Sequence, residues 1–370
     1  MIAPARRAAI DALALVDSDQ VDLGAAVARV RPTLADDRDR ALLLELVAGT
    51  LRMRGAIDYQ LAARVNRPLS RLDQAVLRVL RLGAFQLIYL SRLPPSAIIN
   101  DAVELTRRSG KSSAAGLVNA VLRALSKDRQ QLVWPEREQL AHHLATVHSH
   151  PRWLVERWLK RFGLESTESW LVFNNAPAPL CLAVNRLVTT REALIDELSA
   201  AGITATPTRR AVNGLEVDDA RALHTPAFAE GRFVLQDEAS QLIAELADAT
   251  PGATVLDLCA SPGGKTVALA GAVGAAGSVT ACDVRPNRLR LLARTLERCR
   301  IANANIVHVP ASGGLPFRID RFDLVLIDAP CSGLGTIRRD PDIRWRRSED
   351  DLGRFALEQR DLLNRAAPLV

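Results

Sequence analysis

The spacing of apolar residues predicts that residues 1 to about 130 are almost wholly helical. One stripe at the three- and four-residue spacing of a helix face consists of Leu117, Val118, Val121, Leu122 and Leu125. A second stripe consists of Ile98, Ile99, Ala102, Val103 and Thr106. Because the helical segments are short and joined by brief connections, we expect them to pack as a compact bundle.

Local end signals divide this region into separate helices. Ser70 followed by Asp73 predicts a capping box that opens a helix continuing to Leu90, and Pro94-Pro95 then breaks the chain. The helix after this break is expected to end at Arg107-Arg108 before Gly110. Cations suit the last turn of a helix, and glycine suits the position just beyond it.

Residues 131 to about 235 predict a small mixed α/β module between two larger domains. Histidines cluster at positions 142, 143, 148 and 150, but no cysteine or carboxylate completes a ligand set, so we expect no metal. For Trp153 and Trp158, packing of a helix is favoured over base stacking. The turn-rich run from Asn174 to Pro179 leads into a short strand, Leu180 to Val184.

From about Gly231 the pattern alternates between strands and helices. The candidate strands are Thr254–Leu258, Ser278–Cys282, Asn305–Val309 and Asp323–Ile327, and the helices are Thr266–Ala272 and Pro286–Arg300. This alternation predicts a parallel, doubly wound, Rossmann-like sheet that binds ligands at the carboxyl ends of its strands. The expected fold class is therefore multidomain: an all-α bundle, a small α/β module and an α/β domain.

Composition narrows the classes of partner and compartment. The 370 residues carry a formal net charge of +6, which suits a polyanionic partner such as nucleic acid without proving one. The five cysteines form no C-x-x-C pair, which argues against a zinc site and against a disulfide framework. The sequence shows neither an apolar leader nor a run of 18 apolar residues. We expect a cytoplasmic monomer without membrane contact.

A glycine-rich turn follows the first candidate strand, between Cys259 and Thr266. A Walker phosphate loop would need glycine five residues before Gly264, where Cys259 stands, and the dinucleotide pattern G-x-G-x-x-G is absent. Glycines still let the backbone approach a ligand closely, and Asp283 ends the next strand, where acidic residues accept hydrogen bonds from ribose hydroxyls. A ribose beside a group other than phosphate fits S-adenosylmethionine. A turn without any ligand is the alternative.

A second motif, Asp328-Ala329-Pro330-Cys331-Ser332-Gly333, follows the fourth candidate strand. Carbon 5 of cytosine is too electron-poor to attack a methyl donor directly, whereas addition of a thiolate at carbon 6 makes carbon 5 nucleophilic. A carboxylic acid near ring nitrogen 3 supports that addition. Asp328 and Cys331 beside a methyl donor therefore predict cytosine-5 methylation, and the alternative is an inert, buried Cys331.

A basic segment lies just beyond this motif. It contains Arg338, Arg339, Arg344, Arg346 and Arg347 around Trp345. Guanidinium groups pair with phosphates, and the planes of tryptophan and arginine stack on unpaired bases. Taken alone, such a run is more often a solvated face, but beside the predicted cleft we favour contact with nucleic acid.

Over essentially its whole length the chain resembles the Sun/RsmB group of bacterial ribosomal RNA cytosine-5 methyltransferases. Segments 82–87, 99–105 and 118–123 resemble its NusB-like N-terminal domain, and segments 150–155 and 236–240 its middle region and catalytic entry. The resemblance implies a NusB-like RNA-binding domain over residues 1–130 and an RNA-binding or linker module over residues 131–235. Residues 236–370 would form a methyltransferase domain, incomplete at its C-terminal end.

The resemblance also implies a cofactor, a substrate and site residues. The cofactor would be S-adenosyl-L-methionine and the substrate a cytosine in 16S ribosomal RNA, attacked through a covalent cysteine adduct. The methyl-donor site would be lined by Cys259, Ala260, Ser261, Pro262, Gly263, Gly264, Lys265, Asp283 and Asp328. Asp328 and Cys331 would be catalytic, with Cys331 matching the cysteine that assists release of the methylated product.

Two departures from the family pattern stand out. The family usually carries an aspartate after the third strand, near the adenine, whereas Val309–Gly313 contains no acidic residue. The attacking cysteine of the family lies in a later Thr-Cys-Ser segment, and this sequence stops at Val370 before such a segment. We therefore expect a fragment or the product of an early stop, inactive or nearly so, whose fourth strand leaves an exposed sheet edge.

Two alternatives to this interpretation stay open. In the first, Cys331 itself attacks the base, as the cysteine of the Pro-Cys motif does in DNA cytosine methyltransferases. In the second, the chain is a non-catalytic RNA-binding protein that uses its helical domain and basic surfaces alone.

Overall fold

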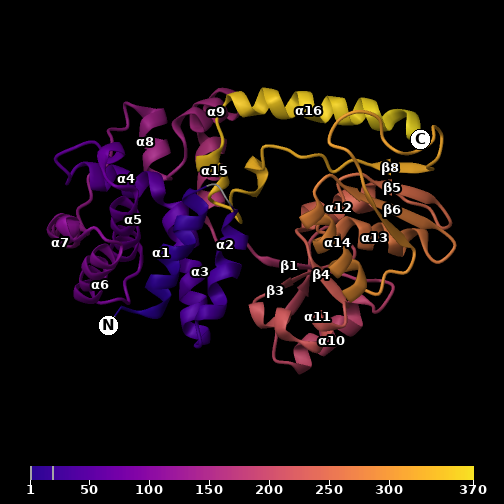
Figure 1. Ribbon diagram of the computed structural model, residues 1–370, viewed down its shortest axis with the longest axis horizontal. Coiled ribbons are helices and arrows are strands. Elements are labelled where there is room, and N and C mark those ends of the chain that lie inside the picture. The colour runs from indigo at the N-terminus through magenta and orange to yellow at the C-terminus, as the bar shows by residue number, and fades with distance from the viewer. Residues whose placement is uncertain (1, 19–20) are drawn as a thin grey trace. The chain divides into compact units, whose positions relative to one another are not determined.

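The computed structural model describes residues 2–18 and 21–370 and divides the chain into two compact units (Figure 1). The helical unit comprises residues 1–177 together with the segment 333–349. The sheet unit comprises residues 178–332 and 350–370. Each unit contains hydrophobic clusters of its own.

The helical unit is built around α5 (Gln74–Tyr89), which packs against α3 (Asp37–Arg52), α6 (Pro95–Arg108) and α7 (Ala115–Asp128). The other helices of the unit are α1 (Pro4–Asp17), α2 (Leu23–Val30), α4 (Arg54–Ala62), α8 (Leu140–Val147), α9 (Arg152–Asn175) and α15 (Ile343–Arg346). α3 and α5 pack so closely that a Cβ atom at Gly49 of α3 would collide with the ring of Phe85 of α5. The predicted all-α bundle is confirmed.

The predicted helix ends are confirmed for α6 and corrected for α5. α6 ends at Arg108, ahead of Gly110. α5 begins at Gln74, because the Asp73 carboxylate accepts a hydrogen bond from the Ala75 amide at 2.9 Å, so Asp73 is the cap. The expected cap, Ser70, lies instead in a separate 3-10 turn, Leu69–Arg71.

α9 consists of two helical segments that meet at Gly163. This glycine has φ 74° and ψ −179°, a backbone region that is essentially closed to other residues. In a straight helix Trp158 and Trp170 would be about 18 Å apart along the axis. Their ring centroids are 6.3 Å apart with the planes at 86°, so the break at Gly163 folds the second segment back toward the first.

The sheet unit contains an antiparallel and a parallel sheet (Figure 1). The antiparallel sheet has the order β2-β3-β1-β4, with β1 at Leu180–Val184, β2 at Ala205–Pro207, β3 at Gly214–Val217 and β4 at Phe233–Leu235. Its strands bury Leu182 and Leu215 against Leu194 and Leu198 of α10 (Arg191–Ala200), and α11 (Pro226–Ala229) completes this layer. β1 spans the residues predicted for it.

The parallel sheet has the order β7-β6-β5-β8. Its strands are β5 (Thr254–Asp257), β6 (Ser278–Asp283), β7 (Ala304–His308) and β8 (Leu324–Leu326). The helices of this part of the unit are α12 (Glu238–Leu246), α13 (Gly264–Val273), α14 (Pro286–Arg298) and α16 (Asp350–Ala366). The predicted strands and helices agree with these to within one or two residues, and the carboxyl ends of β5, β6 and β8 meet at one edge.

Among the described residues β8 is an edge strand, paired only with β5 and half-buried. The residues after α16 pack beside its start, where the amides of Arg321 and Phe322 donate to the Leu369 carbonyl at 3.1 and 3.0 Å. Leu369 joins Leu256 in one hydrophobic cluster. Within the described part of the chain, no helix combines the length and the apolar character needed to cross a membrane.

Candidate active site

The glycine-rich loop connects the end of β5 to the first turn of α13. Gly263 caps α13 with φ 111°, a conformation that side-chain-bearing residues rarely adopt, and a Cβ atom there would lie 3.0 Å from Leu292 Cδ1. The loop is fastened to its neighbours, because the Ala260 amide donates to the Cys282 carbonyl at 2.8 Å and the Ser261 hydroxyl donates to the Arg288 carbonyl at 3.0 Å. The N-terminus of α13 therefore lies at the carboxyl end of the sheet.

An ion pair brings the two sequence motifs together. Lys265, from the glycine-rich loop, places its Nζ 2.7 Å from Oδ2 of Asp328, which follows β8. The Lys265 side chain is 12% exposed and that of Asp328 is 50% exposed, so the carboxylate faces solvent while the ammonium group is largely covered. Gln359 of α16 steadies the same segment, because its Nε2 donates to the Pro330 carbonyl at 2.9 Å.

Asp257 is a third carboxylate at this edge of the sheet, and it was not among the predicted site residues. It is fully buried, and its Oδ2 accepts a hydrogen bond from the Thr266 hydroxyl at 2.7 Å. Its other oxygen, Oδ1, has no hydrogen-bond partner among the described residues. Burial raises the pKa of Asp257 to about 6, against the opposing effects of Thr266 and Lys265. The sequence signal was available, because Asp257 ends the strand that opens into the loop.

Asp283 lies at the end of β6, as predicted, and its carboxylate is almost fully buried. Its Oδ1 accepts from the Arg285 amide at 3.0 Å, and its Oδ2 is 3.8 Å from Nη1 of Arg288. Since an ionised carboxylate has about four acceptor positions, Asp283 retains capacity for a ligand hydroxyl. The loop after β7 is bound by α16, because the Arg365 guanidinium donates hydrogen bonds to the carbonyls of Pro310 and Ala311.

The cysteines differ sharply in accessibility. Of the five, all of which the structure describes, only Cys331 is exposed. Burial, helped by Asp283 and other nearby carboxylates, raises the pKa of Cys259 to about 12, and burial raises that of Cys282 to about 12 as well. A pKa this high keeps the Cys259 thiol neutral at physiological pH, a state that does not favour nucleophilic attack. Cys331 is therefore not buried, which corrects the structural half of the alternative to a reactive Cys331.

Comparison with known proteins gives matches along the chain. Residues 3–127 match the NusB family, residues 150–224 the ferredoxin-like domain of RsmF/B-like methyltransferases, and residues 244–370 the 16S rRNA methyltransferases RsmB/F. The chain is 36% identical over 370 residues to the ribosomal RNA small subunit methyltransferase B of Pseudomonas putida, a match that covers 99% of this chain and 82% of that protein. This chain belongs to that methyltransferase family.

Two further relatives agree with this membership. The probable ribosomal RNA small subunit methyltransferase B of Bacillus subtilis is 35% identical over 338 residues, which cover 90% of this chain and 74% of that protein. The crystal structure of PH0851 is 25% identical, with a TM-score of 0.85, and covers 100% of this chain and 84% of that one. The resemblance to the Sun/RsmB methyltransferases and the expected fold class are thus confirmed.

The basic segment around Trp345 was expected to contact nucleic acid, but its central arginine, Arg344, is buried. Arg344 is fully buried within the helical unit, where it donates to the Ser149 carbonyl at 2.9 Å, to Asn175 Oδ1 at 3.0 Å and to the Asn174 carbonyl at 3.4 Å. Burial lowers the pKa of its guanidinium to about 9. The Trp345 indole donates to the Leu51 carbonyl at 2.6 Å.

The predicted nucleic-acid contact is therefore wrong for Arg344, which is fully buried with its guanidinium bonded to the protein interior. For Trp345, which is half-buried, base stacking stays a prediction. Arg338 is engaged as well, since its guanidinium lies 4.4 Å from the ring centroid of Phe173 and its Nε donates to the Ala176 carbonyl at 3.3 Å. Nothing in the local pattern of the sequence could have revealed this, because the partners are 161 to 294 positions away. The segment anchors itself in the helical unit.

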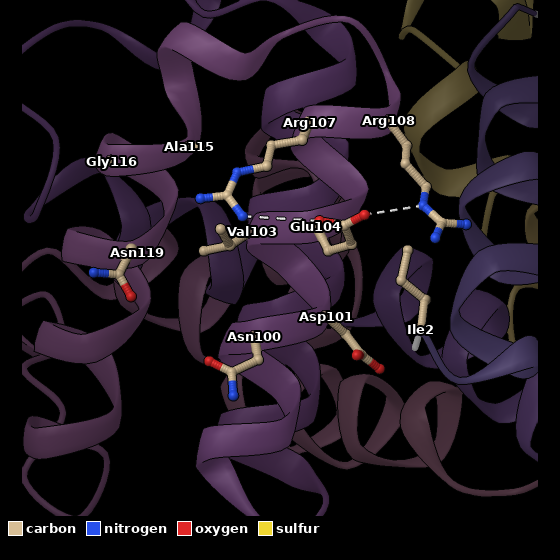
Figure 2. Close-up of a pocket in the computed structure, with 10 residues that line it drawn as sticks. All are labelled: Ile2, Asn100, Asp101, Val103, Glu104, Arg107, Arg108, Ala115, Gly116 and Asn119. Atoms are coloured by element: carbon tan, nitrogen blue, oxygen red, sulfur yellow. Dashed lines mark hydrogen bonds and ion pairs between the residues drawn. The ribbon is translucent and has the colours of Figure 1, made fainter.

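The helical unit also contains a polar cleft of about 570 Å³ between α6 and α7, shown in Figure 2. Arg107 and Arg108 approach Glu104 from two sides, at 3.8 and 3.1 Å (Figure 2). Both arginines are more than half exposed, so these ion pairs are weak and leave the guanidinium groups able to meet a ligand. Val103 was predicted to be buried but is half-buried and lines this cleft, while Leu105 is buried in its place.

The histidine cluster serves packing and local hydrogen bonds. His143 Nδ1 lies 2.6 Å from the Pro135 carbonyl, His150 Nδ1 lies 2.7 Å from the His148 carbonyl, and His150 packs edge-on against Trp158. Among the residues that the structure describes, no group of three or more potential metal ligands occurs.

Proposed function

We propose that this chain binds S-adenosylmethionine at the carboxyl ends of β5, β6 and β8 and methylates carbon 5 of a cytosine in 16S ribosomal RNA. The observation that carries the proposal is the 2.7 Å ion pair between Lys265 and Asp328, because it joins the glycine-rich loop to the Asp-Ala-Pro-Cys segment. Membership of a ribosomal RNA methyltransferase family supports the reaction class. The carbon-5 position and the cofactor rest on the chemistry of the residues.

The charges at this edge suit the cofactor. S-adenosylmethionine carries a sulfonium, an ammonium and a carboxylate group, which makes it a cation overall, and when bound it supplies an electrophilic methyl group. Asp257, Asp283 and Asp328 lie close enough to Cys259 to raise its pKa. Lys265 lies 2.7 Å from Asp328, and Arg288 lies 3.8 Å from Asp283. The unpartnered Oδ1 of Asp257 is a buried acceptor that an ammonium group would satisfy. Asp283 would accept from the ribose, and residues 259–265 would line the site.

Asp328 and Cys331 would act on the cytosine base. A protonated Asp328 would donate its proton to ring nitrogen 3 while a cysteine thiolate forms a bond to carbon 6, which shifts an electron pair to carbon 5. After methylation, a base removes the carbon-5 proton, nitrogen 3 returns its proton to Asp328, and the electron pair expels the cysteine sulfur, which restores the aromatic ring. We assign Cys331 to this release step, and attack by Cys331 itself is the alternative.

Binding of the cofactor is tested by calorimetry on the 370-residue chain. We expect S-adenosylmethionine to bind, and Asp283→Ala to weaken binding because a ribose acceptor is lost. Asp196→Ala, an exposed aspartate on α10, is the matched control and should bind as the parent does. Failure of the parent chain to bind would remove the enzyme proposal and favour the non-catalytic RNA-binding alternative.

The role of Cys331 is tested with the Cys331→Ser variant of the full-length protein, which is incubated with undermethylated 16S RNA. Accumulation of a covalent RNA adduct that resists denaturing gels supports release by Cys331. Disappearance of both adduct and product means that Cys331 attacks. Methyl transfer at an unchanged rate without any adduct would exclude both roles.

The remaining assignments follow from the proposed substrate. We propose RNA binding for residues 1–130 and for the module over residues 131–235, with Arg107 and Arg108 of the polar cleft as phosphate contacts. Residues 236–370 would carry methyl transfer. Because bacterial ribosomal RNA is made and assembled in the cytoplasm, we propose that compartment, and the monomeric state stays a prediction.

A further inference from the structure

A second cleft in the helical unit, which we call the aromatic cleft, has a different character. It has a volume of about 410 Å³ and is lined by Trp158, Phe162, Ser166, Trp170, Leu334 and Gly335. Its walls are apolar except for the Ser166 hydroxyl. Such a volume is within the range of small-ligand sites, about 300 to 1,000 Å³.

The aromatic rings around this cleft form a connected series with exposed faces. Trp158 meets Trp170 edge to face at 6.3 Å, and Trp170 stacks on Phe173 at 5.2 Å with an interplanar angle of 13°. Trp170 is 36% exposed and Phe162 is 50% exposed. Large apolar side chains gathered in this way on a surface mark a binding site, whereas single exposed ones need no explanation.

Cations accompany the aromatic series. The Arg161 guanidinium lies 5.4 Å from the ring centroid of Phe162, and that of Arg338 lies 4.4 Å from the centroid of Phe173. Lys160 is exposed on the same helix. Acidic residues occur too: Glu168 is paired with Arg137 at 3.6 Å, and Glu165 is exposed next to Ser166. Flat apolar faces with cations beside them match a nucleobase attached to phosphates better than they match an apolar peptide.

We propose that the aromatic cleft stacks one unpaired base of the substrate RNA. The inference rests on the proposed function and adds a site to it. Because any base has a flat face, we expect the cleft to be tolerant of base identity.

The test separates stacking from electrostatic attraction. Affinities are measured by fluorescence anisotropy for a labelled 12-nucleotide oligoadenylate and for an abasic ribose-phosphate strand of equal length. Trp170→Ala should weaken oligoadenylate binding by about 5- to 100-fold and leave abasic binding unchanged, because it removes a stacking surface but no charge. Trp170→Phe should retain most of the affinity. Phe162→Ala should show a smaller loss of the same kind.

Leu44→Ala is the control, because Leu44 is an exposed apolar residue of α3 in the same unit and does not line the cleft. An equal loss for both strands, or no loss for either, would overturn the inference and leave the cleft to another occupant such as a protein segment. These outcomes would not contradict the proposed methyltransferase function. That function would be contradicted by a separate result, the failure of the parent chain to bind S-adenosylmethionine.

Discussion

At the scale of single residues, Lys265 acts on Asp328 through a 2.7 Å contact. We expect Asp328→Asn to lower kcat for the proposed cytosine methylation by about 10²- to 10⁴-fold, because it removes the group that we propose as the proton donor to nitrogen 3. Lys265→Met should lower kcat by about 10- to 100-fold through misplacement of the carboxylate. Calorimetry with S-adenosylmethionine measures separately how far Lys265→Met changes cofactor affinity, because Lys265 also belongs to the proposed lining of the cofactor site.

Both variants, Asp328→Asn and Lys265→Met, are assayed in the full-length protein by transfer of a labelled methyl group to undermethylated 16S RNA. Lys127→Met, at an exposed position of α7, removes the same charge elsewhere and should leave kcat unchanged. An unchanged kcat in Lys265→Met would show that Asp328 needs no positioning by the lysine.

Asp257 makes stability depend on pH. Its pKa in the folded protein, about 6, is above the ordinary value of 3.8, so the folded state binds more protons than the unfolded state between these values. Stability therefore falls as the pH rises from about 4 to 6, and above that range the ionised, buried carboxylate costs about 3 kcal/mol. We expect Asp257→Asn to raise the free energy of unfolding by up to that amount at pH 8 and by little at pH 4.

Urea unfolding between pH 4 and pH 8 measures this difference. The exposed Asp196→Asn on α10 is the control and should show no pH-dependent gain. A gain from Asp257→Asn that is the same at every pH would contradict the assignment of the titration to this carboxyl.

At the scale of elements, the buried Arg344 makes several of the hydrogen bonds that anchor the segment 333–349 in the helical unit. Arg344→Met would leave the acceptors at Ser149, Asn174 and Asn175 without their donor, and we expect a loss of about 2 to 4 kcal/mol. Arg344→Lys should lose less, because an ammonium group still donates to some of them. Amide hydrogen exchange of residues 333–349 should accelerate in both variants.

The matched control for this segment is Arg152→Met, which removes an exposed arginine from a surface pair with Glu156. It should leave exchange in residues 333–349 as in the parent chain. Protection that survives Arg344→Met would mean that Trp345 and Arg338 hold the segment without it.

The elements also show what can be predicted from sequence and what cannot. The parallel strands and the ends of α6 and β1 were predictable, because apolar periodicity and end signals act over a few residues. The burial of Arg344, the break at Gly163 and the meeting of Trp158 with Trp170 were not. An arginine-rich run has the same local pattern on a surface and in an interior, and only distant partners such as Asn174 decide between them. Likewise Asp73 replaced Ser70 as the cap, since both fit the start of α5.

At the scale of the whole molecule, the net charge of +6 is modest for a protein proposed to bind ribosomal RNA. The location of individual cations therefore matters more than their sum. Each phosphate contact to a single strand contributes about 0.7 to the slope of log affinity against log salt concentration. Replacing Arg107 and Arg108 of the polar cleft by alanine should thus reduce that slope by about 1.4 if both contact phosphates.

The comparison that isolates location is a second double variant, Arg29→Ala with Arg31→Ala, which lowers the net charge equally from another exposed part of the helical unit. It should leave the slope nearly unchanged, because a distant cation outside the interface is screened within about 8 to 10 Å. Equal reductions in the two variants would mean that RNA responds to overall charge. The polar cleft would then lose its role as a phosphate contact, while stacking in the aromatic cleft, which involves no ion release, would be unaffected by that result.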